Sequence, residues 1–150
     1  MEISVNQVEF LRECDRAFGF LVEEFDFHKE LSTAEPGLTR VDYVKDGVAV
    51  ECVLEARDLD VSVKIVRCSH GQLPTAFRID ETGVLVREYL TQLLLRRGIR
   101  DIGFPRLDHT PRVLSFQQRC RRALEGYAAM LRKHARDVLE GSSSILDAEA

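Results

Sequence analysis

Hydrophobic and polar residues alternate most regularly in the middle of the chain. Over 48–57 we expect apolar side chains on one face and mostly polar ones on the other: Val48, Val50, Cys52, Leu54 and Ala56 against Ala49, Glu51, Val53, Glu55 and Arg57. The alternation resumes over 59–65. A period of two is typical of strands with one buried and one largely solvated face. The pattern therefore predicts two neighbouring strands that share a buried side.

Two further strands are expected ahead of this pair. Residues 20–28 (FLVEEFDFH) are rich in aromatic side chains, which favour a half-buried pleated surface, and predict an edge strand around Phe25 and Phe27. Residues 39–44 (TRVDYV) predict another strand, followed by a turn at 45–47 (KDG). Asp-Gly suits a tight hairpin because both residues tolerate positive φ. Short links between these strands indicate an antiparallel meander of about three to four strands.

Helical spacing dominates the start of the chain. Ser4 and Gln7 have the spacing of a capping box, and apolar residues follow at helical intervals as far as Phe18. Gly19 would provide a left-handed stop. The pattern predicts a first helix over about 5–18.

Two more helices are expected in the second half. Residues 84–97 (VLVREYLTQLLLRR) predict a helix that ends at Gly98. Ser115 and Gln118 form a second possible capping box, so the last helix is expected to start within 111–116 and to run to about residue 140.

The order of these elements predicts one α+β domain over 1–140, in which two C-terminal helices pack on one face of the sheet. Residues 141–150 predict a flexible tail. A chain of 150 residues with 45% hydrophobic and 31% charged residues can bury a core and is not disordered. Because no apolar run approaches ~20 residues and no signal peptide is recognisable, we expect a cytoplasmic bacterial protein without a membrane partner.

Motifs that carry catalytic chemistry are missing from the sequence. There is no G-x-G-x-x-G, P-loop, H-E-x-x-H or G-x-S-x-G pattern. His70 and His109 fall in predicted loops, where only tertiary structure could give them partners. The cysteines show no C-x-x-C spacing and are expected to be reduced thiols: Cys14, Cys52, Cys68 and Cys120. We therefore predict no enzymatic activity, no cofactor and no metal site.

Charge is distributed unevenly along the chain. Residues 1–75 carry fifteen acids and eight bases, and residues 76–150 carry ten acids and thirteen bases. The segment 96–136 alone has eleven bases and three acids, which suggests nucleic-acid binding through residues such as Arg121, Arg122 and Arg132.

Helical geometry favours a different interpretation of these bases. At ~100° per residue, the apolar residues of 116–138 form one stripe, whereas the bases spread over roughly 160° and do not form a ridge along a phosphate backbone. The overall pI of about 5.6 also argues against nucleic acid. A solvated outer face, or one that complements the acidic first half, is the favoured interpretation, and nucleic-acid binding stays as the alternative.

The segments FGFLVEEFDF and VDYVKDGVAVECVLEARDLDVSVKIVR carry a resemblance that covers roughly residues 5–100. In its order of a first helix, a β-meander and further helices, the chain resembles a broad set of small bacterial proteins, a number of which are thought to be immunity proteins that neutralise a toxin from neighbouring cells. The resemblance implies a role in binding a protein partner, such as a cognate toxin, and assigns no residue.

The residues suggest where such a partner would bind. Asp42, Glu51 and Glu55 are expected on the solvated sheet face, where an acidic patch would compete with phosphate for the basic residues of a nuclease toxin. The alternative is that these carboxylates only solvate the surface. A homodimer through the same face or through the edge strand also stays open.

Overall fold

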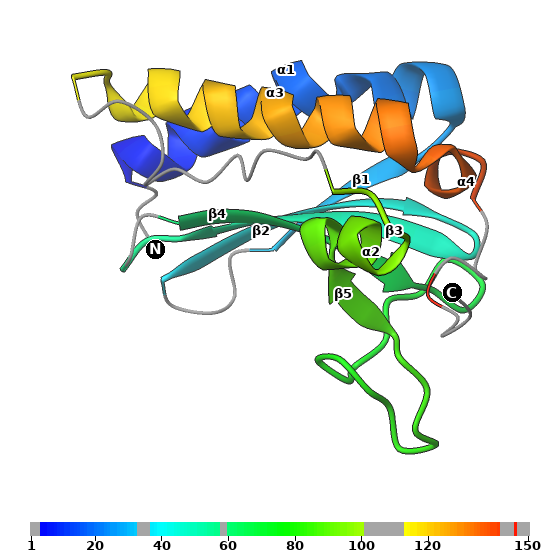
Figure 1. The fold of residues 1–150 in the computed structure, drawn as a ribbon. Coiled ribbons are helices and arrows are strands. Elements are labelled where there is room, and N and C mark those ends of the chain that lie inside the picture. The colour runs from blue at the N-terminus through cyan, green and yellow to red at the C-terminus, as the bar shows by residue number, and fades with distance from the viewer. Residues whose placement is uncertain (1–3, 33–36, 58–59, 101–112, 142–145, 147–150) are drawn as a thin grey trace.

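The computed structural model describes residues 4–32, 37–57, 60–100, 113–141 and 146. Two helices lie side by side over one face of an antiparallel sheet (Figure 1). The elements follow in the order α1 (Val5–Phe25), β1 (His28–Ser32), β2 (Leu38–Lys45), β3 (Val48–Glu55), β4 (Asp60–Arg67), β5 (Arg87–Tyr89), α2 (Leu90–Arg96), α3 (Phe116–His134) and α4 (Arg136–Leu139). The predicted α+β class is confirmed, with five strands where about three to four were expected.

The sheet is a simple meander in the order β1-β2-β3-β4-β5, and each strand is antiparallel to the next. Val41, Cys52 and Val63 are successive cross-strand partners and are all buried on the helical side. The alternation therefore predicted the buried side of β3 and β4 correctly.

The turn between β2 and β3 lies at residues 46–47, as expected, but neither residue has a positive φ. The carbonyl of Asp46 accepts the amide of Gly71, and the carbonyl of Gly47 accepts the amide of Cys68. Hydrogen bonds from residues outside the hairpin therefore stabilise this turn, and the positive φ angles that were expected are absent at residues 46 and 47.

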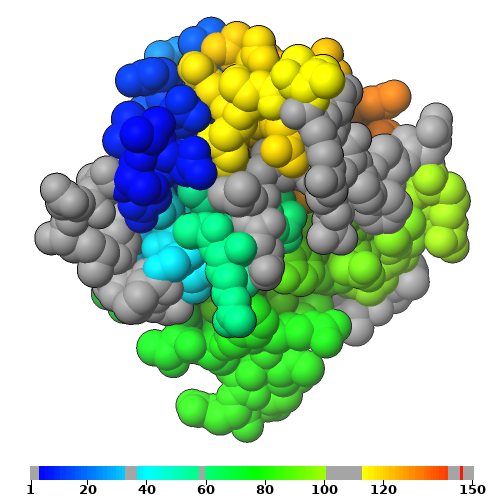
Figure 2. Space-filling model, turned by 90° about the vertical axis from the view of Figure 1, so that its left-hand side faces the viewer, coloured from blue at the N-terminus to red at the C-terminus, as the bar shows by residue number. Residues whose placement is uncertain are grey.

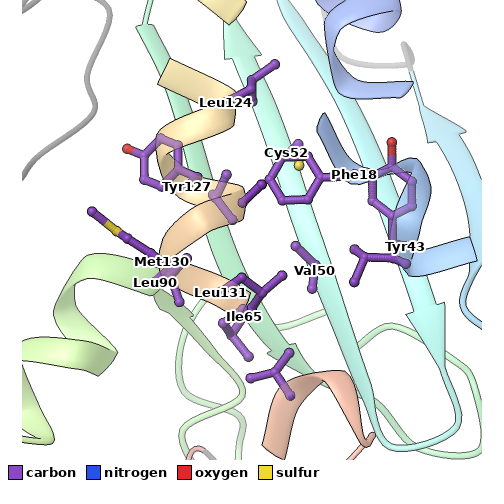
Figure 3. Packing of buried hydrophobic residues seen from close by; sticks show 14 of the residues in the cluster. Phe18, Tyr43, Val50, Cys52, Ile65, Leu90, Leu124, Tyr127, Met130 and Leu131 are labelled. Atoms are coloured by element: carbon purple, nitrogen blue, oxygen red, sulfur yellow. The ribbon is translucent and has the colours of Figure 1, made fainter. Parts of the chain in front are cut away.

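The core fills the space between the helices and the sheet. Side chains of α1, α3 and the central strands meet there, and the rings of Phe18 and Tyr43 lie 5.9 Å apart (Figure 3). Three of the four thiols, those of Cys14, Cys52 and Cys120, belong to this core, and each behaves as a small apolar group. Burial of large aliphatic and aromatic side chains, worth about 1.5–3 kcal/mol each, is the main stabilising term.

Helix α1 is longer than predicted. Its capping box between Ser4 and Gln7 is confirmed, but the helix continues through Gly19 to Phe25, and Asp26 caps it with φ 63°. Phe18, Leu21 and Phe25 keep the apolar stripe at helical spacing, so packing on the core extends the helix. The predicted edge strand around Phe25 and Phe27 is therefore wrong, and the edge strand next to β2 is β1.

The predicted helix over 84–97 is wrong in its first half. Arg87–Tyr89 pair with Lys64–Val66 of β4 as strand β5, and α2 starts only at Leu90. The free edge of β4 offers backbone partners that the local sequence does not reveal. Gly98, with φ 83°, follows the helix as expected.

The last predicted helix is divided in two. Its capping box between Ser115 and Gln118 is confirmed, and α3 ends at His134. Ala135 has φ −133° and ψ 48°, which interrupts the helix before α4.

Of the predicted tail, the structure describes Gly141 and Leu146, and Leu146 is 1% exposed in the core. His109 lies outside the described residues.

Candidate binding face of the sheet

The sheet face opposite α1 and α3, here called the open face, carries the charged side chains of the strands. Asp42, Glu51, Lys64 and Tyr89 are successive cross-strand partners and form one row across β2–β5. They share a face because side chains alternate along each strand and the register aligns them. Residues 68–86, called the connector, project from the sheet on the side away from α1 and α3 (Figures 1 and 2).

Four of these side chains form a buried charge cluster, defined here as Arg40, Asp42, Glu51 and Arg87. Arg40 Nε lies 3.0 Å from Asp42 Oδ2 and 3.7 Å from Glu51 Oε2. Arg87 Nε lies 3.2 Å from Glu51 Oε1. Asp42 and Glu51 are 1% and 2% exposed, so these contacts are shielded from water and strengthened by the low dielectric.

Asp42 and Arg87 each have one buried polar atom without a hydrogen-bond partner among the described residues, and for Arg87 this atom is Nε. For Asp42 it is Oδ1, which has no hydrogen-bond donor in the described structure. Burial raises the pKa of Asp42 to about 7, and the charge of Glu51 adds to this effect against the opposing influence of Arg40. A protonated Asp42 can donate a hydrogen bond to Glu51, whereas an ionised Asp42 cannot. The pair is thus best satisfied when it shares one proton.

Arg87 connects the charge cluster to the connector. Its Nη1 donates to the carbonyl oxygens of Ala76 at 2.6 Å and Phe77 at 3.2 Å. The side chain of Arg87 is 8% exposed, so these bonds and its pairing with Glu51 replace its hydration. Arg87 thereby fixes the backbone that carries the Phe77 ring over the open face.

Two cavities open on this face, with volumes of about 310 Å³ and about 270 Å³. Both are lined by Lys64, Phe77, Arg87 and Tyr89. Lys64 Nζ lies 4.6 Å from the centre of the Phe77 ring and 5.1 Å from the centre of the Tyr89 ring. Burial lowers the pKa of Lys64. The two cavities therefore share a partly desolvated cation between two aromatic rings.

The predicted partner-binding residues have different environments. Asp42 and Glu51 are brought together but are buried, because Arg40 and Arg87 cover them. The expectation that this face is largely solvated is therefore wrong for these two residues, and it is also wrong for Ala49 and Val53 of β3. Glu55 is exposed and lines the larger cavity. The open face therefore has no uncompensated acidic patch at Asp42 and Glu51.

Sequence reasoning missed several residues of the open face. Extending the alternation that identified Glu51 across β2 would have found Arg40. The alternation over 59–65 already placed Lys64 on this face but did not distinguish it as a binding residue. Arg87 and Tyr89 were assigned to a helix, so their place on the sheet could not be seen. No local signal places Phe77 of the connector over a strand.

The bases predicted to bind nucleic acid mostly contact α1. Arg121 Nε lies 2.9 Å from Glu13 Oε1, and Arg132 Nη2 lies 3.5 Å from Glu24 Oε2. Arg132 also stacks on Phe20, with its guanidinium carbon 3.8 Å from the ring centre. The third, Arg122, is exposed. Two of the three bases thus pair with acids of the first half of the chain, and two of the three, Arg122 and Arg132, are exposed.

Other chemistry is sparse in the described part of the chain. His70 has φ 51° in the connector and lines neither cavity of the open face, and Cys68 beside it is buried with its pKa raised by burial to about 12. No group of three or more potential metal-ligating side chains occurs among the described residues. None of the described helices is both long and apolar enough to cross a membrane.

Comparisons with known protein families, with curated protein sequences and with solved structures found no match.

Proposed function

We propose that this protein is a non-catalytic protein-binding module of the toxin-immunity type, and that it binds its partner through the open face. The observation that carries the proposal is that α1 and α3 share one side of the sheet, while the other side combines buried charges with exposed aromatic side chains. Phe77 is 69% and Tyr89 46% exposed beside the charge cluster. Aromatic and arginine side chains of this kind are enriched at the centres of protein interfaces.

The chemistry of the face favours binding over reaction. Arg40 and Arg87 pair with Asp42 and Glu51, so these two carboxylates are engaged within the fold. Exposed charges on the same face, such as that of Glu55, would disfavour a partner whose charges do not match them and so provide specificity. The outer face of α3 is a weaker candidate because Arg121 and Arg132 already pair with α1.

The direct test is co-purification of the chain with the product of the gene adjacent to its own, followed by calorimetry of the purified pair. Glu55→Lys and Phe77→Ala alter exposed side chains of the open face and are expected to weaken the complex at least about tenfold. Glu125→Lys makes the same charge change on the exposed side of α3 and serves as the matched control. Failure of the adjacent product to bind, or equal losses in Glu125→Lys and Glu55→Lys, would overturn the proposal.

A further inference from the structure

The smaller cavity of the open face has an unbalanced charge. Of its lining, Arg87 is paired with Glu51, and Glu88 is paired with Arg96, whose Nη2 lies 2.7 Å from Glu88 Oε2. Lys64 and Arg78 also line this cavity, and no carboxylate of the described residues pairs with either of them. Lys64 and Arg78 are thus two cations of the cavity without an ion pair among the described residues, although the negative charges of Glu51 and Glu55 also act on Lys64.

Lys64 is held ready for an anion. Its residue is 8% exposed, and its ammonium rests between the rings of Phe77 and Tyr89. Aromatic faces stabilise a cation but accept no strong hydrogen bond, so the three ammonium donors are incompletely satisfied there. A carboxylate that reached the cavity would meet a cation that is already oriented and mostly stripped of water.

The connector, which contributes Phe77 and Arg78 to the cavity, also exposes apolar side chains. The connector and the strand that follows it expose four large apolar side chains: Phe77, Ile79, Val84 and Tyr89. Ile79 and Leu85 form a β-bridge, which ties the two halves of the projecting connector together. A ligand for this site therefore has a negative group close to apolar side chains, which a folded or extended polypeptide supplies more readily than a small polar anion.

We infer that the cavity between Lys64, Phe77, Arg78 and Tyr89 receives an Asp or Glu side chain of a protein partner, flanked in the partner by aliphatic or aromatic residues. The inference rests on the proposed function, because it names the partner chemistry for the same face. In this proposal the two cations and the two aromatic rings contact the partner. The buried charge cluster does not contact the partner and instead holds Arg87 and the connector in place.

A random peptide library displayed on phage and selected against the whole chain tests this site without a known partner. Enriched peptides are expected to share an acidic residue next to an aliphatic or aromatic one. In calorimetry, a synthetic copy of an enriched peptide should lose at least about tenfold in affinity when its acid is changed to the amide, and by a similar factor against Lys64→Met. Acetate at the same concentration is expected not to compete, which separates a peptide carboxylate from a free anion.

The variants need controls for folding and for general charge. Lys64→Met keeps the apolar stem and removes a desolvated charge, so its melting temperature should be unchanged or higher. Arg78 is exposed, so Arg78→Gln provides a second variant that does not change the core. Lys133→Gln removes an exposed charge on α3 and should bind the peptides as the wild type does.

The outcomes separate this inference from the proposed function. Enriched peptides without acids, no enrichment at all, or peptide affinity unchanged in Lys64→Met and Arg78→Gln would each overturn the site. If the adjacent gene product binds but is indifferent to Lys64→Met, the site fails and the proposed function stands. If acidic peptides bind through Lys64 and the adjacent product does not bind, the toxin-immunity function fails and the site stands.

Discussion

Asp42 and Glu51 lie directly opposite each other on β2 and β3, and both carboxyl groups are buried on the open face. Burial and the charge of Glu51 disfavour the ionised form of Asp42, and Arg40 only partly offsets this effect. The centre of the open face is therefore sensitive to the protonation of one carboxyl group.

Stability is expected to fall as the pH rises through this titration. The pKa of Asp42 is about 7 in the folded protein and near its ordinary value of 3.8 in the unfolded chain, so the folded state holds a proton that the unfolded state releases. The contribution is fully present below about pH 4 and is lost above about pH 7, with a size on the order of 1–3 kcal/mol. Asp42→Asn should flatten this decline, because the amide stays neutral and can still accept from Arg40.

Urea unfolding between about pH 5 and pH 8 measures the effect. Glu55→Gln removes an exposed carboxylate from the same face and should keep the wild-type slope. An Asp42→Asn protein with an undiminished slope would show that another group titrates.

Glu13 is expected to contribute most among the carboxylates that join the two long helices. Burial by itself would raise the pKa of Glu13, but hydrogen bonds from Arg121 and Gln117 outweigh it and hold the pKa below its usual range. Glu13→Gln removes the charge that these donors surround and should cost about 1–3 kcal/mol in the free energy of unfolding. Glu24→Gln breaks an exposed pair and should cost less than about 1 kcal/mol. Equal losses in the two variants would contradict this ranking.

Two glycines are expected to respond in opposite directions to the same substitution. A Cβ added at Gly19, inside α1, meets nothing within 4 Å, so Gly19→Ala should stabilise the protein by about 0.5–1 kcal/mol. Gly98 has φ 83°, which L side chains rarely adopt, so Gly98→Ala should destabilise it by roughly 1 kcal/mol. Thermal melts of the two variants give the comparison. A destabilised Gly19→Ala would indicate that α1 ends at residue 18 after all.

Nucleic acid is expected to bind weakly or not at all through α3. Arg121 and Arg132 are paired with Glu13 and Glu24, although Arg132 is exposed like Arg122, so two of the three predicted bases are already partly neutralised. Fluorescence anisotropy with labelled single- and double-stranded oligonucleotides should show no tight binding even at low salt. Strong, salt-sensitive binding that disappears when all three arginines become glutamine would restore the alternative function.

The comparison of sequence with structure shows where local information was sufficient. The capping boxes at Ser4 and Ser115 were visible because cap and partner are three residues apart. The alternation of β3 was visible because each residue's face follows from its neighbours. At Gly19, local turn chemistry was misleading, since the apolar stripe of α1 continues beyond it and outweighs a small helix penalty.

By itself, the sequence determined the α+β class, the two helix starts, the buried side of the central strands and the presence of Asp42, Glu51 and Glu55 on the opposite side. Only the tertiary structure decided that 87–89 form an edge strand, that Arg40 and Arg87 cover the buried acids, and that Phe77 lies over Lys64. The physical reason is that most of these contacts join residues distant in the chain, whose partners supply backbone bonds, charge or a ring that no short segment contains. Arg40 is only two positions from Asp42, but its contact with Glu51 depends on the pairing of β2 with β3.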